Sequence, residues 1–144
     1  MASETMFKHI LVPTDFTEKS LRALEIAMKM AFQDMCRVTV LHVIETIEDA
    51  EGDEFTEFYE RLRTRSHKRL TEIVDRFVSR DLLIQTEILY GNRANEIVRF
   101  AQENSIDLIV LSSHRIDAAS EALGFGTISY KVGILAHCPV MMVK

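Results

Sequence analysis

The segment GFGTIS, residues 124–129, holds the residue types best suited to bind a phosphate group. Glycine permits positive φ and close backbone approach, and the chain has only five glycines. Thr127 and Ser129 add hydroxyl donors, and a helix beginning here presents free backbone N–H groups to an anion. A second interpretation is a turn on glycine with Thr127 as a helix cap. The pattern alone leaves both open, because short Gly-x-Gly matches are weak signals.

No convincing catalytic set accompanies this segment. The chain has neither a Gly-Lys-Ser/Thr phosphate loop nor a Gly-x-Ser-x-Gly nucleophile motif. Cys36 and Cys138 cannot be paired with a histidine from the sequence. His114 has no partner at metal-ligand spacing, and its role stays open. The sequence therefore favours a binding protein over an enzyme.

Composition excludes several classes of function. The net charge of -5 argues against binding to nucleic acid through bulk electrostatics and leaves only local basic patches open. No apolar run approaches the roughly 20 residues that span a membrane. The first residues lack the basic start and apolar core of a secretory signal, and the two cysteines form no CxxC pair. We expect one cytoplasmic domain, residues 1–144, with free thiols and no nucleic-acid or membrane partner.

Short apolar runs alternate with longer segments of helical periodicity. We expect strands at residues 9–13, 37–44, 82–89, 107–113 and 139–143. We expect helices at residues 15–32, with Thr17 as the N-cap, and at 53–80, 95–104 and 128–137. The charged face of the segment 53–80 is interpreted as solvated. This alternation predicts an α/β fold with a parallel sheet and helices on both faces.

In doubly wound sheets, ligands bind at the carboxyl ends of the strands. Four segments lie there: PTDF, HVIE, YGNR and SSHR. Asp15 in the first can satisfy backbone donors of the following helix, or accept hydrogen bonds from a ribose or an adenine. We interpret His42, inside an apolar run, as a hydrogen-bonded core residue.

Four stretches together resemble the universal stress protein family: ILVPTDFTEKSLRALEIA, LHVIE, YGNRANEIVRFAQENSIDLIVLSSH and GTISYKVGILAHCPVMMVK. The resemblance covers the chain from about Phe7 to Lys144. It implies a five-stranded parallel sheet in the order 3-2-1-4-5, similar to the adenine-nucleotide alpha-hydrolase fold. It also implies a homodimer that forms through the last strand, from Pro139 to Val143.

Many members bind ATP through a glycine motif: Gly, two residues, Gly, nine residues, then Gly followed by Ser or Thr. The final pair matches Gly126 and Thr127, but Ser112 and Arg115 stand at the first two glycine positions, and the spacer 116–125 is one residue too long. The resemblance implies that Pro13, Thr14 and Asp15 line the adenosine and that Val43 offers backbone groups to adenine. It adds to the nucleotide site Ser112, Ser113, His114, Arg115, Gly126, Thr127, Ile128 and Ser129.

Two functions follow. The first is a cytoplasmic stress-response module that binds ATP or AMP, with Mg²⁺ or Mn²⁺ carried by the phosphates, and signals to an unidentified protein partner. The second is a dimeric interaction module that has lost nucleotide binding, in keeping with the departures at Ser112 and Arg115. If the protein has any catalytic activity, we expect at most slow ATP hydrolysis, because no clear general base is present.

Overall fold

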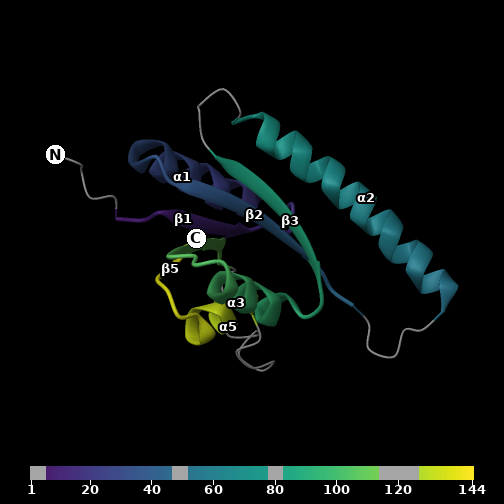
Figure 1. The fold of residues 1–144 in the computed structure, drawn as a ribbon. Coiled ribbons are helices and arrows are strands. Elements are labelled where there is room, and N and C mark those ends of the chain that lie inside the picture. The colour runs from purple at the N-terminus through teal and green to yellow at the C-terminus, as the bar shows by residue number, and fades with distance from the viewer. Residues whose placement is uncertain (1–5, 47–51, 78–82, 114–126) are drawn as a thin grey trace.

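The computed structural model describes residues 6–46, 52–77, 83–113 and 127–144. Its strands are β1 (His9–Pro13), β2 (Arg37–Ile44), β3 (Ile84–Tyr90), β4 (Leu108–Ser112) and β5 (Val140–Val143). Its helices are α1 (Glu18–Asp34), α2 (Asp53–Asp75), α3 (Arg93–Glu103) and α5 (Ile128–Leu135). All strand pairs are parallel, in the order β3-β2-β1-β4-β5 (Figure 1). The predicted sheet, its strand order and the helices on both faces are confirmed.

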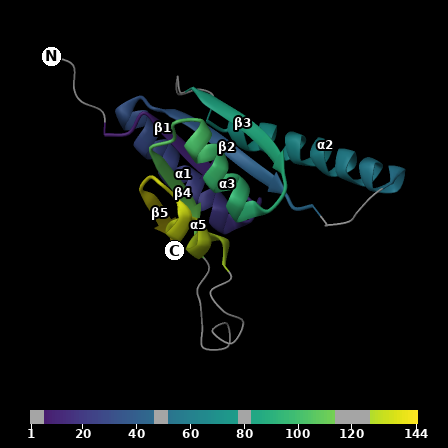
Figure 2. The ribbon, with the colours of Figure 1, turned by 60° about the horizontal axis from the view of Figure 1, so that its bottom comes forward.

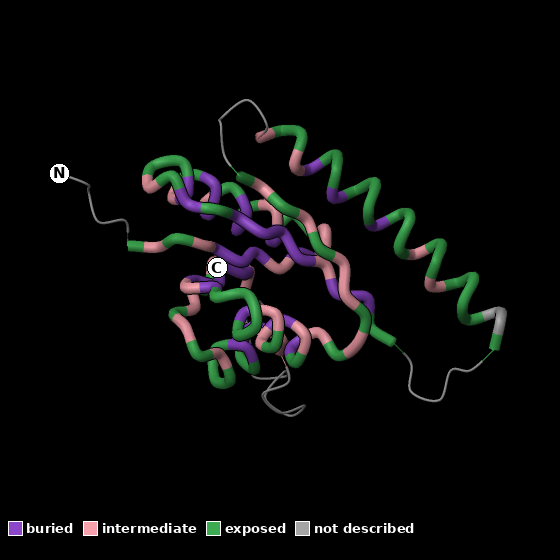
Figure 3. The backbone as a smooth tube through the Cα atoms, viewed as in Figure 1, coloured by how far each residue is buried: buried purple, intermediate pink, exposed green. Residues whose placement is uncertain are grey.

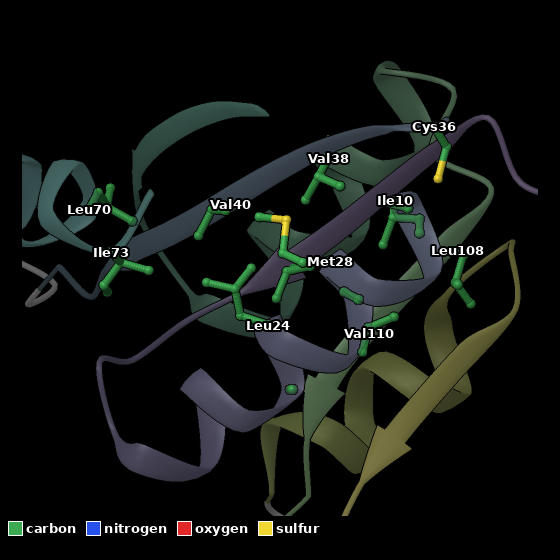
Figure 4. Packing of buried hydrophobic residues seen from close by; sticks show 14 residues of the cluster. Ile10, Leu24, Met28, Cys36, Val38, Val40, Leu70, Ile73, Leu108 and Val110 are labelled. Carbon is green, nitrogen blue, oxygen red and sulfur yellow. The ribbon is translucent and has the colours of Figure 1, made fainter. Parts of the chain in front are cut away.

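Two apolar clusters lie on opposite faces of the sheet. Helices α1 and α2 pack on one face, while α3 and α5 pack on the other (Figure 2). Successive residues of β1 supply both clusters: Ile10 and Val12 join the first, and Leu11 joins the second. Leu24 and Met28 of α1 meet Ile10 in the first cluster (Figure 4). A central strand must therefore be apolar at every position, which explains its unalternating sequence.

Side-chain caps fix where three helices begin. The Thr17 hydroxyl accepts from Ser20 N–H at 3.3 Å, so the predicted cap of α1 is confirmed. Thr127 caps α5 by accepting from Tyr130 N–H at 3.4 Å. Asn92 caps α3 by accepting from the N–H of residue 95 at 3.1 Å. Because this third cap was missed, α3 begins two residues before its predicted start.

Other boundaries also differ from prediction. Helix α2 ends at Asp75, before the predicted end at residue 80, because Arg76 and Phe77 close a tighter turn onto the carbonyls of residues 73 and 74. Strand β3 begins at residue 84, not 82, and α5 ends at residue 135, not 137. Strand β4 is one residue shorter than predicted at each end, and β5 begins one residue later than predicted but ends at residue 143 as expected. Differences of one or two residues at element ends are common, because the last residues of an element keep only part of its hydrogen bonding.

The start of α2 is more exposed than its apolar residues suggest. Phe55 and Phe58 near its start are exposed, whereas Leu70 and Ile73 near its end are buried. Figure 3 shows this change along the helix, whose first half extends past the sheet. None of the helices within the described ranges is long and apolar enough to cross a membrane.

Candidate functional site

A cleft lies at the carboxyl end of the sheet, where β1 and β4 leave it in different directions. From β1 the chain enters α1 on one face, while β4 is followed by α5 on the other, so the strand order reverses here. The cleft holds about 510 Å³ of space, part of it open to solvent. The residues that line it are Pro13, Thr14, Asp15, Ser20, Leu41, Val43, Arg93, Ile97, Leu111, Ser112, Ile128 and Ser129.

The structure brings most of the predicted site residues to this cleft. Those that line it are Pro13, Thr14, Asp15, Val43, Ser112, Ile128 and Ser129. Ser113 does not line it and donates its backbone N–H to Val143 O at 2.8 Å, and Thr127 acts as the α5 cap. His114, Arg115, Gly124 and Gly126 lie outside the described residues.

Sequence reasoning missed several lining residues. No role was assigned to Ser20, nor to Arg93 although it belongs to the YGNR segment. The apolar walls formed by Leu41, Ile97 and Leu111 follow from their burial in the second cluster. The position of Arg93 just after a strand could have identified it as a lining residue. Ser20 lies in the first turn of α1, and its sequence carries no such signal.

A chain of hydroxyl groups fixes the loop that follows β1. The Ser20 hydroxyl donates to Thr17 O at 2.8 Å, so its oxygen accepts from the Thr14 hydroxyl at 3.0 Å. The Thr14 oxygen in turn accepts from Phe16 N–H at 3.1 Å. Thr14 and Ser20 are both buried, and these bonds satisfy their polar groups without water. The loop is therefore held from within before any ligand arrives.

The Asp15 carboxylate is held in an ionised state at the rim of the cleft. Its Oδ1 accepts from Thr17 N–H at 3.0 Å and from the Thr17 hydroxyl at 2.6 Å. Burial by itself raises the pKa of Asp15, but these hydrogen bonds outweigh it, and the pKa lies below the ordinary value. Because both bonds end on Oδ1, Oδ2 can accept hydrogen bonds from a ligand. Both uses proposed for this carboxylate are thus geometrically compatible.

Val43 presents its backbone to the cleft. Leu41 O accepts from Thr14 N–H at 2.8 Å, whereas Ile44 O accepts from Gly91 N–H at 3.0 Å, so alternate residues of β2 point to opposite neighbours. Val43 therefore points to the same side as Leu41, and the β1–β2 register ends at the pair Pro13 and Leu41. Its N–H and C=O face the space beyond the end of β1, where they can pair with the edge of a heterocyclic base.

The first turn of α5 also lines the cleft. Ile128 and Ser129 follow the Thr127 cap and line the cleft. The first N–H groups of a helix have no intrahelical partner, and the helix dipole favours an anion there. This end suits a phosphate, as the sequence of the segment predicts.

Arg93 gives the cleft a positive charge near the ends of β2 and β3. Its Nε lies 3.6 Å from Glu45 Oε1, and both side chains are partly exposed. No cluster of three or more metal-ligating side chains occurs in the part of the chain that the structure describes.

The comparisons with known proteins agree with this architecture. The model of the universal stress protein family matches residues 6–144. Universal stress protein MJ0531 of Methanocaldococcus jannaschii is 31% identical, over 98% of this chain and 84% of its own length. The solved structure of MJ0577 from the same organism has a TM-score of 0.82 and 27% identity, covering 96% of each chain.

A further solved structure, a universal stress protein in complex with cAMP, has a TM-score of 0.70 and 21% identity, covering 96% of this chain and 97% of that one. At that identity the likeness shows the fold alone. The family match over nearly the whole chain, together with the relative at 31% identity, shows more than the fold. This chain belongs to the universal stress protein family.

Proposed function

We propose that the cleft binds an adenine nucleotide, ATP or AMP, and that the protein is a cytoplasmic, dimeric stress-response module whose occupancy signals to a protein partner. The observation that carries this proposal is the order of groups along one cleft. Val43 belongs to β2, Asp15 follows β1 and α5 follows β4, and these three strands are neighbours in the order β2-β1-β4. The groups that they bring to the cleft match a base, a ribose and a phosphate in the order in which a nucleotide carries them.

Each part of the ligand has a chemical partner. The N–H and C=O of Val43 complement the donor and acceptor edge of adenine, and Pro13 and Leu41 add apolar surface. The Asp15 Oδ2 accepts from ribose hydroxyls as a charge-assisted bond. Ile128 and Ser129 offer N–H groups to the phosphate, which carries any Mg²⁺ or Mn²⁺. A universal stress protein of the same fold, 21% identical to this chain, was solved in complex with cAMP, itself an adenine nucleotide.

The second candidate is a dimeric interaction module of the same fold without nucleotide. One observation favours it: Ser112 lines the cleft where the nucleotide motif of the family has a glycine. A side chain at that point takes space that a ribose would otherwise use against bare backbone. Both candidates share the homodimer, which we assign to β5 because Met141 and Met142 expose apolar surface on a strand at the edge of the sheet.

Calorimetry separates the two candidates. The purified protein is denatured to release any retained small molecule, which is identified, and the refolded protein is titrated with ATP, ADP, AMP and adenosine. Retained nucleotide, or binding in the micromolar range of about -8 kcal/mol, supports the nucleotide module. No retained ligand and no heat at millimolar concentration would reject it in favour of the interaction module.

A further inference from the structure

Phe16 has a backbone conformation that its side chain disfavours. Its φ of 67° lies in the left-handed region, where a bulky residue without a glycine's freedom is strained by about 1–2 kcal/mol. The residue follows Thr14 and Asp15, both of which line the cleft, and precedes the α1 cap Thr17. Contacts elsewhere must offset this strain, because the chain would otherwise relax to an ordinary conformation.

Two other elements hold the Phe16 ring. The His42 ring from β2 lies against one side, with centroids 4.4 Å apart and planes inclined by 34°. The Arg69 guanidinium from α2 lies over the ring, with Cζ 4.8 Å from the centroid, within the range of a cation–π interaction. A loop residue, a strand residue and a helix residue thus form one stack, which we call the Arg69–Phe16–His42 stack.

The stack is joined to the backbone of the cleft loop. His42 Nδ1 donates to Thr14 O at 2.8 Å, on the chain just before Phe16. On the other side, the bonds from Thr17 to Asp15 Oδ1 span Phe16. The position of the ring and the position of the Asp15 carboxylate are therefore fixed together.

We propose that Phe16 and Arg69 are positioning residues: by holding the ring, the stack keeps the loop in its strained conformation, which places the Asp15 carboxylate for ligand binding. This inference rests on the proposed nucleotide function. Without the stack, the loop relaxes, and a ligand must restore the strained conformation as it binds. The apparent affinity is then the intrinsic affinity multiplied by the fraction of molecules whose loop is still correctly placed, so it falls as that fraction falls. Helix α2, remote in sequence, is thereby coupled to occupancy of the cleft.

A matched pair of substitutions at Phe16 separates positioning from simple packing. Phe16→Leu removes the aromatic stack but keeps the cost of a positive φ. Phe16→Gly removes the ring and that cost together, because glycine adopts this φ freely. We expect Phe16→Leu to weaken AMP binding more than Phe16→Gly does. If the ring serves only to fill space, the order reverses, since glycine loses more buried apolar surface than leucine. The reversed order, or equal affinities for both variants and the wild type, would overturn the proposal.

Arg69 supplies a second test on a different element. Arg69→Met keeps the aliphatic length and loses the cation, and we expect AMP affinity to fall by about two- to fivefold, as the loss of a partly exposed cation–π contact implies. Arg69→Lys restores part of this affinity, because lysine retains the charge over the ring. Arg65→Met, one turn earlier on α2 and exposed, is the control and leaves the affinity unchanged. Equal losses in Arg65→Met and Arg69→Met would show a general charge effect and contradict the stack.

A ligand-independent measurement keeps the inference separate from the proposed function. Hydrogen exchange of the Thr17 amide, which bonds Asp15 Oδ1, reports the loop without any nucleotide. We expect the exchange to be fastest in Phe16→Leu, intermediate in Phe16→Gly and slowest in the wild type. If this order appears but the wild type binds no nucleotide, the stack positions the loop and the proposed function is wrong. If nucleotide binds but all three variants exchange alike, the positioning role is wrong and the function stands.

Discussion

His42 and Thr14 are joined by a hydrogen bond of 2.8 Å between the imidazole Nδ1 and the backbone carbonyl oxygen. A carbonyl can only accept, so Nδ1 carries the proton and the neutral ring keeps its lone pair on Nε2. The predicted hydrogen bonding of His42 is confirmed, but its side chain is only partly buried and joins neither core cluster. The bond ties β2 to the loop that lines the cleft.

This partly buried imidazole makes stability depend on pH. Burial lowers the pKa of His42 below 6.5, with a smaller opposing effect from the Thr14 bond. The unfolded chain then binds more protons than the folded one near pH 6, so stability falls as pH decreases through about 6.5 and is fully present above it. We expect the denaturant midpoint to decline between pH 7.5 and 5.5. His42→Asn flattens part of that decline, because an asparagine amide replaces the Nδ1 donor without titrating.

His9 provides the matched comparison for this test. Burial and the nearby charge of Arg37 lower its pKa too, and its Nε2 lies 2.7 Å from the Thr39 hydroxyl. His9→Gln therefore removes a separate part of the slope while keeping a hydrogen-bonding group at the Nε2 position. The stability of the double variant should change little with pH above about 5, where Asp15 stays ionised. A double variant as steep as the wild type would show that neither histidine carries the effect.

Asp15 should contribute strongly to nucleotide affinity if its Oδ2 receives ribose hydroxyls. We expect Asp15→Ala to weaken adenosine binding by about ten- to a hundredfold, the range for a lost hydrogen bond to a charged group. Calorimetric titration measures the change, and thermal unfolding confirms that the variant is folded. Asp34→Ala removes the same charge at the far end of α1 and should leave the affinity unaltered. Unchanged binding in Asp15→Ala would remove this residue from the site.

The fold was predictable because its signals are local. Each buried strand reads as a short apolar run, and β1 is apolar at consecutive positions because it feeds both clusters. Thr17 marks the start of α1 by its own hydroxyl. The exposure of Phe58, 47%, could not be predicted, since it depends on how far α2 extends past the sheet and not on the periodicity of the helix.

The site was predictable only in part. Strand ends identify which loops meet, and so Asp15 and Ser112 were placed correctly at one cleft. The positive φ of Phe16 has no local signal, because glycine or asparagine is the usual residue there. Arg69 reaches the site by a tertiary contact between elements far apart in the sequence. Such contacts are fixed by how helices lie on the sheet, which residue types alone do not reveal.

Ser112→Gly tests whether the departure from the glycine motif limits binding. Ser112 ends β4 and lines the cleft, so removing its side chain lets a ligand lie closer to the backbone. We expect AMP affinity to rise several-fold, with a loss in stability of about 0.5–1 kcal/mol from the added glycine. Ser113→Gly, next in the chain but outside the lining, is the control. Unchanged or weaker binding in Ser112→Gly would mean that the serine hydroxyl fits the ligand as it stands.

The edge strand β5 should mediate the homodimer. It pairs with β4 on one side only, and Met141 and Met142 are 37% and 38% exposed. Two copies that pair β5 to β5 around a two-fold axis satisfy these main-chain groups and cover the methionines. We expect light scattering to give twice the 16.5 kDa mass of the chain. Met142→Lys should shift this to the monomer mass, because a charge would be buried without a partner in the interface.

Leu83→Lys is the control for the dimer test. Leu83 is 67% exposed and directly precedes β3, the strand at the opposite edge of the sheet. The same charge there should leave the dimer intact, since the proposed interface lies four strands away. If Leu83→Lys is a monomer and Met142→Lys is a dimer, the interface lies at the β3 edge instead. A wild-type monomer at micromolar concentration would reject the dimer, and the exposed methionines would then need a different partner.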